Sequence, residues 1–253
     1  MALDRPDLRA RREKTYAAMV GLFGVVLVLT NIVGVKLFVL FADGRPGWMP
    51  GEGPLTLTTG ILTYPITFLL TDLVSELWGR KRADFMVVLG FLMSLLMLGV
   101  LQMARALPPS ELWTNGDLEL DAAGMQRAFE ASFSYPATLL FASMTAYLVA
   151  QLIDVRLYHF WWRVTQGRNM WIRNNGSTGI SQLVDTIIVN SIFLRLAFGL
   201  GWGDISGIIA AVYLCKLVLA MLDTPLIYLG KALLERFLGV EPDAKRLVAP
   251  LVD

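Results

Sequence analysis

The chain has 253 residues, of which 55% are hydrophobic and only 17% are charged. Soluble domains carry about 25% charged residues, so this composition indicates a membrane protein, and a net charge of +1 gives no reason to expect nucleic acid as a partner. One cysteine, Cys215, excludes an intrachain disulfide, and with one histidine, His159, a zinc-type metal site is not expected. The glycine upstream of Gly230-Lys231 that a Walker phosphate loop needs is missing, so we expect neither ATP hydrolysis nor a cofactor.

Six apolar stretches are long enough to cross a bilayer, which takes about 20 residues in a helix. They lie at about 16–41, 59–78, 83–103, 134–160, 177–200 and 206–235. The first is too long for a cleavable signal, and no small-residue cleavage site follows it. The predicted fold class is an all-α integral membrane protein with six transmembrane helices over 16–235, a basic N-terminal tail over 1–15 and a C-terminal tail over 236–253.

Basic residues gather in alternate loops, and this placement predicts the orientation. The basic segments are the N-terminal tail (Arg5, Arg9, Arg11, Arg12 and Lys14), the turn at 79–82 (Arg80, Lys81 and Arg82), the loop after the fourth span (Arg163, Arg168 and Arg173) and the C-terminal tail (Arg236, Lys245 and Arg246). The loops over 42–58, 104–133 and 201–205 have few basic residues or none. Because basic loops remain in the cytoplasm, both termini are predicted to be cytoplasmic.

Charged residues also occur inside the predicted spans. They are Lys36, Asp72, Glu76, Asp154, Asp185, Arg195, Lys216 and Asp223. Each costs roughly 2.5–3.5 kcal/mol at the centre of a membrane helix, so we expect them to face the bundle interior. Snorkelling to the interface is the alternative for Glu76 and Lys36. The cations are predicted either to pair with carboxylates or to line an outer vestibule.

Polar residues recur at helical spacing on three spans. The sets are Pro65, Asp72 and Glu76; Ser143, Tyr147, Gln151, Asp154 and Tyr158; and Thr178, Ser181, Gln182 and Asp185. Hydrogen bonds that only hold helices together contribute about 0.6 kcal/mol each, and three stripes with carboxylates exceed that need. We favour a polar cavity that opens toward the cytoplasmic half.

Two local signals refine this prediction. Pro65, two turns inside its span, predicts a helix kink, because proline leaves a carbonyl without its donor. The run Asn174-Asn175-Gly176 predicts a turn, with Ser177 or Thr178 capping the next helix. Trp171 and Arg173 are then expected at the cytoplasmic interface.

The segments YPITFLLTDLVSELWGRKRA, AYLVAQLIDVRLY and WIRNNGSTGISQLVDTII, in this order, resemble the queuosine precursor transporter family, also called the vitamin uptake transporter (VUT) family. The likeness runs from the first span to the sixth. It implies a multi-pass protein of the bacterial inner membrane that imports 7-deazaguanine bases such as preQ0 or preQ1. It also implies a helical bundle similar to the substrate-binding subunits of energy-coupling-factor importers, working without their ATPase.

The residues predicted for substrate binding suit such a nucleobase-like cargo. Carboxylates accept hydrogen bonds from base amino groups, amides supply the complementary donor, and aromatic rings stack on the base. Glu76, Asp154 and Asp185 are predicted to include the edge acceptor, and Asp72 is a further predicted substrate-binding residue. The amide partners are Gln151, Asn175 and Gln182, and the stacking surface is Tyr147 or Trp171. The alternative for Asp72 is a structural pair with Lys216 or Arg195.

Two other function classes stay open at this point. Gly201-Trp202-Gly203-Asp204 matches the GxGD pattern of intramembrane aspartyl proteases, but a turn explains it as well, and we expect no enzyme. An Asp204→Ala variant would abolish a protease and leave a transporter unaffected. The third class is a substrate-capturing subunit that needs an energy-coupling partner. The sequence decides neither a homodimer nor the energy source, which is facilitated diffusion, trapping by metabolism or ion coupling.

Overall fold

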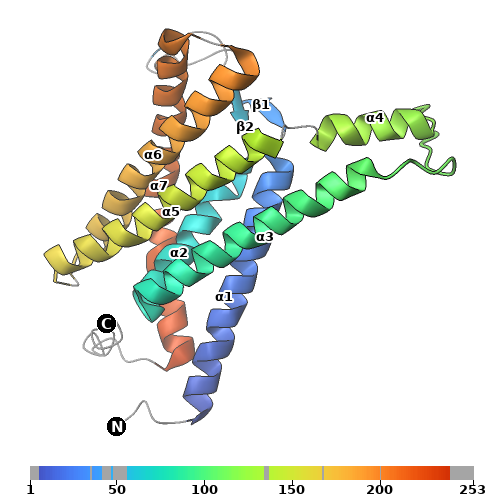
Figure 1. Ribbon diagram of the computed structural model, residues 1–253. Coiled ribbons are helices and arrows are strands. Elements are labelled where there is room, and N and C mark those ends of the chain that lie inside the picture. Colours follow the sequence, from blue (N-terminus) through green and yellow to red (C-terminus); the bar gives the residue numbers. More distant parts are fainter. Residues whose placement is uncertain are drawn as a thin grey trace.

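The computed structural model describes residues 6–34, 36–41, 47, 56–133, 137–166, 168–199 and 201–239. Helices dominate these residues, with one short two-stranded sheet (Figure 1). The elements in chain order are α1 (Pro6–Val33), β1 (Leu37–Val39), β2 (Thr56–Thr58), the 3-10 helix η1 (Thr59–Leu62), α2 (Tyr64–Trp78), α3 (Arg80–Ala106), α4 (Ala122–Phe133), α5 (Ala137–Val164), α6 (Met170–Phe198) and α7 (Trp202–Leu238).

Helix α1 begins and helix α7 ends at the same end of the bundle, at the bottom of Figure 1, which we call the terminal end. There Arg11 Nη1 donates to the Phe237 carbonyl at 3.0 Å, and Arg12 Nη2 donates to the Leu77 carbonyl at 2.7 Å. These two contacts join the first turns of α1 to the last residues of α7 and of α2. The β1–β2 sheet and η1 lie at the opposite end, which we call the far end.

Helix α2 is the central element, because it contacts α1, α3, α5 and α7. From Thr67 to Trp78 every residue except Leu69 is buried. One side of α2 packs into the apolar core through Val74, which is fully buried. Its other residues include Asp72 and Glu76, and these face α5, α6 and α7. The most extensive packing in the bundle is between α5 and α6, followed by α6 on α7.

Within the described residues, three helices are long and apolar enough to cross a membrane by length and composition: α1, α3 and α7 over Asp7–Val33, Arg80–Ala106 and Ile205–Leu238. Helices α5 and α6 have 28 and 29 residues and so extend about 42 Å at 1.5 Å per residue. Helix α2 has only 15 residues, about 22 Å, against a hydrocarbon core of about 30 Å. The α-helices that this criterion leaves out are α4, which has 12 residues, and the three that carry the polar stripes.

The first and second predicted spans need correction. Helix α1 ends at Val33, not at 41, and Leu37–Val39 pairs antiparallel with Thr56–Thr58. Pro65 lies in the first turn of α2, so the predicted kink inside a helix is wrong. A proline fits the first turn because its missing N–H has no intrahelical partner there.

The predicted turn at Asn174-Asn175-Gly176 is also wrong, because α6 runs unbroken through it. Asn175 Nδ2 donates back to the Trp171 carbonyl at 3.1 Å and across to Thr224 Oγ1 at 2.9 Å, which keeps its amide inside the helical structure. A Cβ on Gly176 would lie 2.9 Å from Trp161 Nε1. This glycine therefore permits close packing of α5 on α6 and does not serve a turn.

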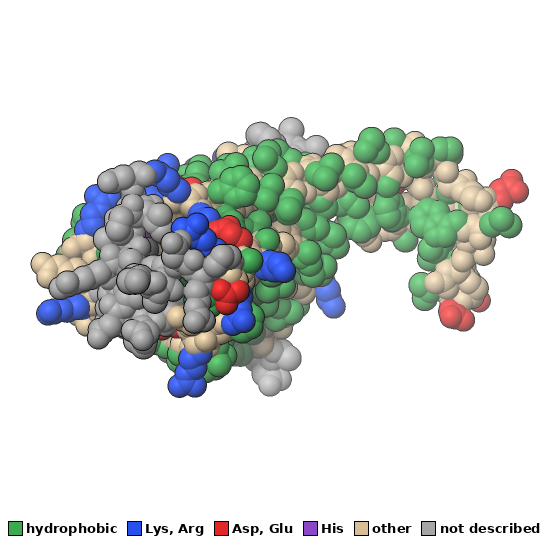
Figure 2. All heavy atoms as spheres, turned by 90° about the horizontal axis from the view of Figure 1, so that it is seen from below, with side chains coloured by type: hydrophobic (Ala, Val, Ile, Leu, Met, Phe, Trp, Pro, Cys, Tyr) green, Lys and Arg blue, Asp and Glu red, His purple; other side chains and the backbone are tan. Residues whose placement is uncertain are grey.

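Helix α4, in a segment expected to be a loop, joins the C-terminal part of α3 in an arm that projects from the bundle (Figure 1). Figure 2, seen from the terminal end, shows Lys and Arg side chains gathered on the bundle and Asp and Glu side chains at the tip of the arm. The exposed acids of this segment include Glu111, Asp117 and Glu119. Charge is therefore segregated between the terminal end and the arm, as the loop composition predicts.

Candidate functional site

The polar stripes of α2, α5 and α6 face one another in the bundle interior, as their helical spacing predicts. The exposed fraction is at most 3% for Asp72, Gln151, Asp154, Gln182 and Asp185. Tyr147 and Tyr158 are buried on the same face of α5, and the side chain of Ser143 lies outside the described residues. Burial of this many polar groups needs compensating partners.

At the terminal end, Glu76 holds four helices together. It accepts hydrogen bonds from Tyr158 Oη at 2.7 Å, from Arg173 Nη2 at 2.9 and 3.1 Å, and from Lys231 Nζ. The Arg173 side chain is 1% exposed, and its guanidinium lies 4.3 Å from the centroid of the Trp162 ring. We call Glu76, Tyr158, Arg173 and Lys231 the Glu76 node. Three donor groups make four contacts with the two carboxylate oxygens, so Glu76 has a structural role in this state.

Toward the far end, Lys216 Nζ contacts Asp185 Oδ2 at 2.7 Å. The pair joins α6 to α7, and both side chains are largely buried. Of the two roles predicted for the cations, Lys216 has the first, pairing with a carboxylate. Asp72 is therefore not the carboxylate that neutralises Lys216.

Between these two ion pairs lies a group of buried polar side chains, each with at least one polar atom that has no hydrogen bond among the described residues. We call this group the central cluster: Asp72, Gln151, Asp154 and Gln182. Among the described residues, neither oxygen of Asp72 and neither amide atom of Gln182 makes a hydrogen bond. Gln151 Nε2 donates to Tyr147 Oη at 2.7 Å, but its Oε1 accepts no hydrogen bond from the described part of the chain. Most buried polar groups in native proteins are hydrogen-bonded, so such a concentration of exceptions calls for an explanation.

Only one of the two Asp154 carboxylate oxygens accepts a hydrogen bond of normal geometry from the described residues. Its Oδ1 accepts a hydrogen bond from Ser181 Oγ at 2.9 Å. The hydroxyls of Ser177 and Thr178 also act on this carboxyl, but Oδ2 has no hydrogen bond of normal geometry within the described part of the chain. Along α6, Ser181 lies about 12 Å from Arg173 and about 6 Å from Asp185 at 1.5 Å per residue. The central cluster is thus enclosed by one ion pair on each side.

The opening beside the central cluster is small, about 20 Å³. It is lined by Ile61, Pro65, Phe68, Thr178, Gln182, Lys216, Leu219, Ala220 and Asp223. A volume of this size holds about one water, whereas ligand sites measure about 300–1,000 Å³. It lies beside the N-terminal turns of α2, on the side away from the Glu76 node. The sequence predicts a cavity that opens toward the cytoplasmic half, and this small opening lies on the side away from the basic terminal end.

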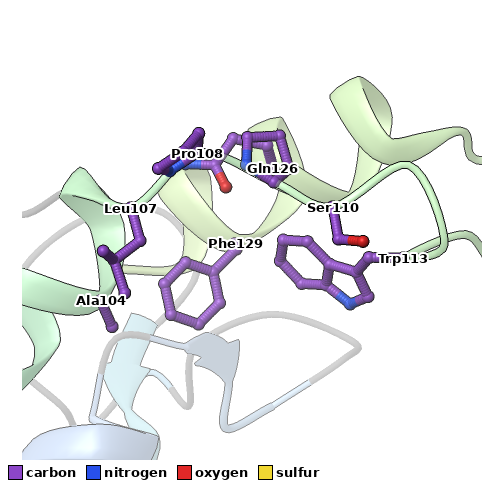
Figure 3. A pocket seen from close by; sticks show the side chains of 8 residues that line it. Ala104, Leu107, Pro108, Ser110, Trp113, Gln126 and Phe129 are labelled. Atoms are coloured by element: carbon purple, nitrogen blue, oxygen red, sulfur yellow. The ribbon is translucent and has the colours of Figure 1, made fainter.

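A larger hollow of about 370 Å³ lies on the projecting arm (Figure 3). Trp113 and Phe129 form its walls, and Ser110 and Gln126 are the polar side chains that line it. None of the described residues that line it is charged. Size alone favours this hollow, but the unpartnered polar chemistry is in the bundle, and we place the candidate site at the central cluster.

The structure does not bring all predicted site residues together. The Trp171 side chain is 54% exposed on the outside of α6, and Asn175 is half-buried and bonded to Thr224. In contrast, two residues of the Glu76 node were not predicted as interior groups: Arg173, expected at the interface, and Lys231. The spacing of four residues between Arg173, Ser177 and Ser181 is the sequence signal that could have placed Arg173 on the polar face of its helix.

Comparison with known proteins places this architecture in a family. The model of a family described as "Putative vitamin uptake transporter" matches residues 58–230, which include every member of the central cluster and most of the Glu76 node. The chain belongs to this family. It is therefore a multi-pass membrane protein of a transporter family, as its apolar helices also indicate.

Two curated relatives carry the name "Probable queuosine precursor transporter". The protein from Bacillus subtilis (strain 168) is 30% identical over 220 residues, which cover 85% of each chain. The protein from Haemophilus influenzae (strain ATCC 51907 / DSM 11121 / KW20 / Rd) is 28% identical over 138 residues, 53% of this chain and 51% of the relative. No solved structure matches the chain.

Proposed function

We propose that this protein imports 7-deazaguanine queuosine precursors of the preQ0 and preQ1 type across a bacterial inner membrane. Its family and the names of both bacterial relatives support the cargo class. The helices α1, α2, α3, α5, α6 and α7 then make six crossings, with both termini in the cytoplasm. The basic residues at the terminal end support this orientation, because Lys and Arg are retained on the cytoplasmic side (Figure 2).

The observation that carries the proposal is the set of unpartnered groups in the central cluster. A 7-deazaguanine presents two parallel N–H donors, from N1 and the 2-amino group, and an acceptor at O6. Asp72 has both oxygens available for the two donors, as carboxylates accept from base amino groups. The Gln182 amide is available for O6, and the buried Tyr147 ring beside Gln151 offers a stacking surface.

This assignment separates carboxylates that the sequence predicts to be equivalent. Glu76 accepts four hydrogen bonds and Asp185 contacts Lys216, so we assign both to the structure that closes the site. Asp72 and Asp154 keep free oxygens and are assigned to the cargo. Because the opening beside them is about 20 Å³, the helices must separate to admit a base. The Glu76 node and the Asp185–Lys216 pair are the contacts that such a movement breaks.

Uptake of a labelled 7-deazaguanine by cells that lack their own transporter tests the proposal. Cells that express the wild-type chain are expected to accumulate the base, and the Asp72→Asn variant is expected to lose most of that uptake. Glu111→Gln, which removes an exposed acid from the projecting arm, is the matched control and should transport normally. Normal uptake by Asp72→Asn at equal membrane abundance would contradict the site, and no uptake by wild type would contradict the function.

A further inference from the structure

The charges buried in the bundle do not balance. Among the described residues the buried acids are Asp72, Glu76, Asp154, Asp185 and Asp223. The basic side chains within ion-pair distance of any of them are Arg173 and Lys231, both on Glu76, and Lys216 on Asp185. Asp72, Asp154 and Asp223 are left without an ion pair in the described part of the chain.

Two of the acids without an ion pair, Asp154 and Asp223, act electrostatically on the third, Asp72. The charges of Asp154, Glu76 and Asp223 all act on the Asp72 carboxyl, and the Arg173 charge that opposes them is already bound to Glu76. Asp223 lines the small opening together with Gln182. A carboxyl group buried here without a counter-charge is costly to ionise, so a ligand that carries a positive charge of its own supplies the missing counter-charge and binds favourably.

From this imbalance we infer that the preferred cargo carries an ammonium group in addition to the flat donor edge, and that Asp154 binds that group. The inference rests on the proposed function and makes it more specific. Among the precursors, it selects the 7-aminomethyl base (preQ1), which is a cation at neutral pH, over the uncharged 7-cyano base (preQ0).

The division of roles between the two carboxylates follows from their hydrogen bonds. Two parallel N–H donors need both oxygens of one carboxylate, and both oxygens of Asp72 are free. Asp154 has one free oxygen, Oδ2, since Oδ1 accepts from Ser181. One oxygen suffices for an ammonium, which is a compact charge and not a planar edge. Asp154 on α5 and Asp72 on α2 can therefore contact opposite ends of one cargo molecule.

The test is a comparison of dissociation constants for the 7-aminomethyl and 7-cyano bases, measured by calorimetry on the purified full-length protein. We expect wild type to bind the aminomethyl base at least tenfold more tightly, which corresponds to about 1.4 kcal/mol at 25 °C. Asp154→Asn should lose this preference and keep its affinity for the cyano base. Asp72→Asn should weaken both bases. Glu111→Gln, on the arm, should match wild type.

The outcomes separate the two proposals. If wild type binds both bases with equal affinity, the inference is overturned while the proposed function stands, and the unpaired acids are then neutralised in another way. If Asp154→Asn retains the tenfold preference, the assignment of the ammonium to Asp154 is wrong. If wild type binds neither base while its melting temperature shows that it is folded, the proposed function itself fails.

Discussion

Substituting Glu76 with glutamine tests whether this carboxylate belongs to the structure or to the cargo site. A glutamine oxygen can still accept from Tyr158, but the Arg173 guanidinium, 1% exposed, loses its counter-charge. Lys231 has a side chain that is 21% exposed and can turn to solvent or to Glu235, so its loss is smaller. Breaking a buried ion pair on one side costs about 3–5 kcal/mol, and this range is the expected loss of stability for Glu76→Gln.

The readout is the melting temperature of the purified protein in detergent. For chains of 150–250 residues 1 kcal/mol shifts this temperature by about 2–4 °C, so we expect a fall of roughly 6–20 °C. Asp72→Asn is the internal comparison: it removes a buried carboxylate that has no hydrogen-bond partner, and its melting temperature should stay within about 3 °C of wild type or rise. Equal melting temperatures for Glu76→Gln and Asp72→Asn would refute the distinction between the Glu76 node and the central cluster.

Other contacts give predictions of graded size. Lys216→Met leaves Asp185 buried without its cation, so the melting temperature should fall by several degrees, and restoring it with Asp185→Leu in the same chain would confirm the pairing. Glu13→Gln should cost at most about 1 kcal/mol, because the pair with Arg82 is exposed. The hydrogen bond from Arg82 lowers the pKa of Glu13 in the folded protein. The stabilisation by this ion pair is therefore complete above the unfolded pKa of about 4.3 and is lost as the pH falls through the folded pKa. Wild type and Glu13→Gln should then have the same melting temperature in strong acid. Gly90→Leu should cost more than 1 kcal/mol, since even a Cβ there would lie 2.4 Å from a ring atom of α1, and unchanged melting would show that α1 and α3 are packed less closely than described.

The sequence predicts the interior faces of the helices well, because burying a charge in a membrane protein restricts where it can point. The spacing of Asp72, Asp154 and Asp185 with their polar neighbours was sufficient to place all three in the interior. The same spacing cannot rank them, since each looks alike until its partners are known. Lys216, from α7, satisfies Asp185, and only the packing of α6 on α7 reveals it.

The misplaced turn and kink have a common cause. Asn-Asn-Gly and proline are strong local signals for a break, but here tertiary contacts and position override them. Gly176 lets Trp161 of α5 approach α6, and Pro65 lies in a first turn that tolerates it. Arg173 was predicted at the interface because it precedes the predicted turn in a basic loop, and its compensation by Glu76 of α2 cannot be seen in its own helix. Partners that are distant in the sequence cannot be predicted from the local sequence pattern.

Transport by the isolated protein tests the central claim most directly. Liposomes that contain only this chain, and no second protein, are given an external labelled 7-deazaguanine, and the internal label is followed in time. The account predicts saturable entry for wild type, near-complete loss in Asp72→Asn, and unchanged entry in the arm variant Glu111→Gln. Entry no faster than in empty liposomes, with the protein folded and correctly inserted, would contradict the account and favour a subunit that needs an energy-coupling partner.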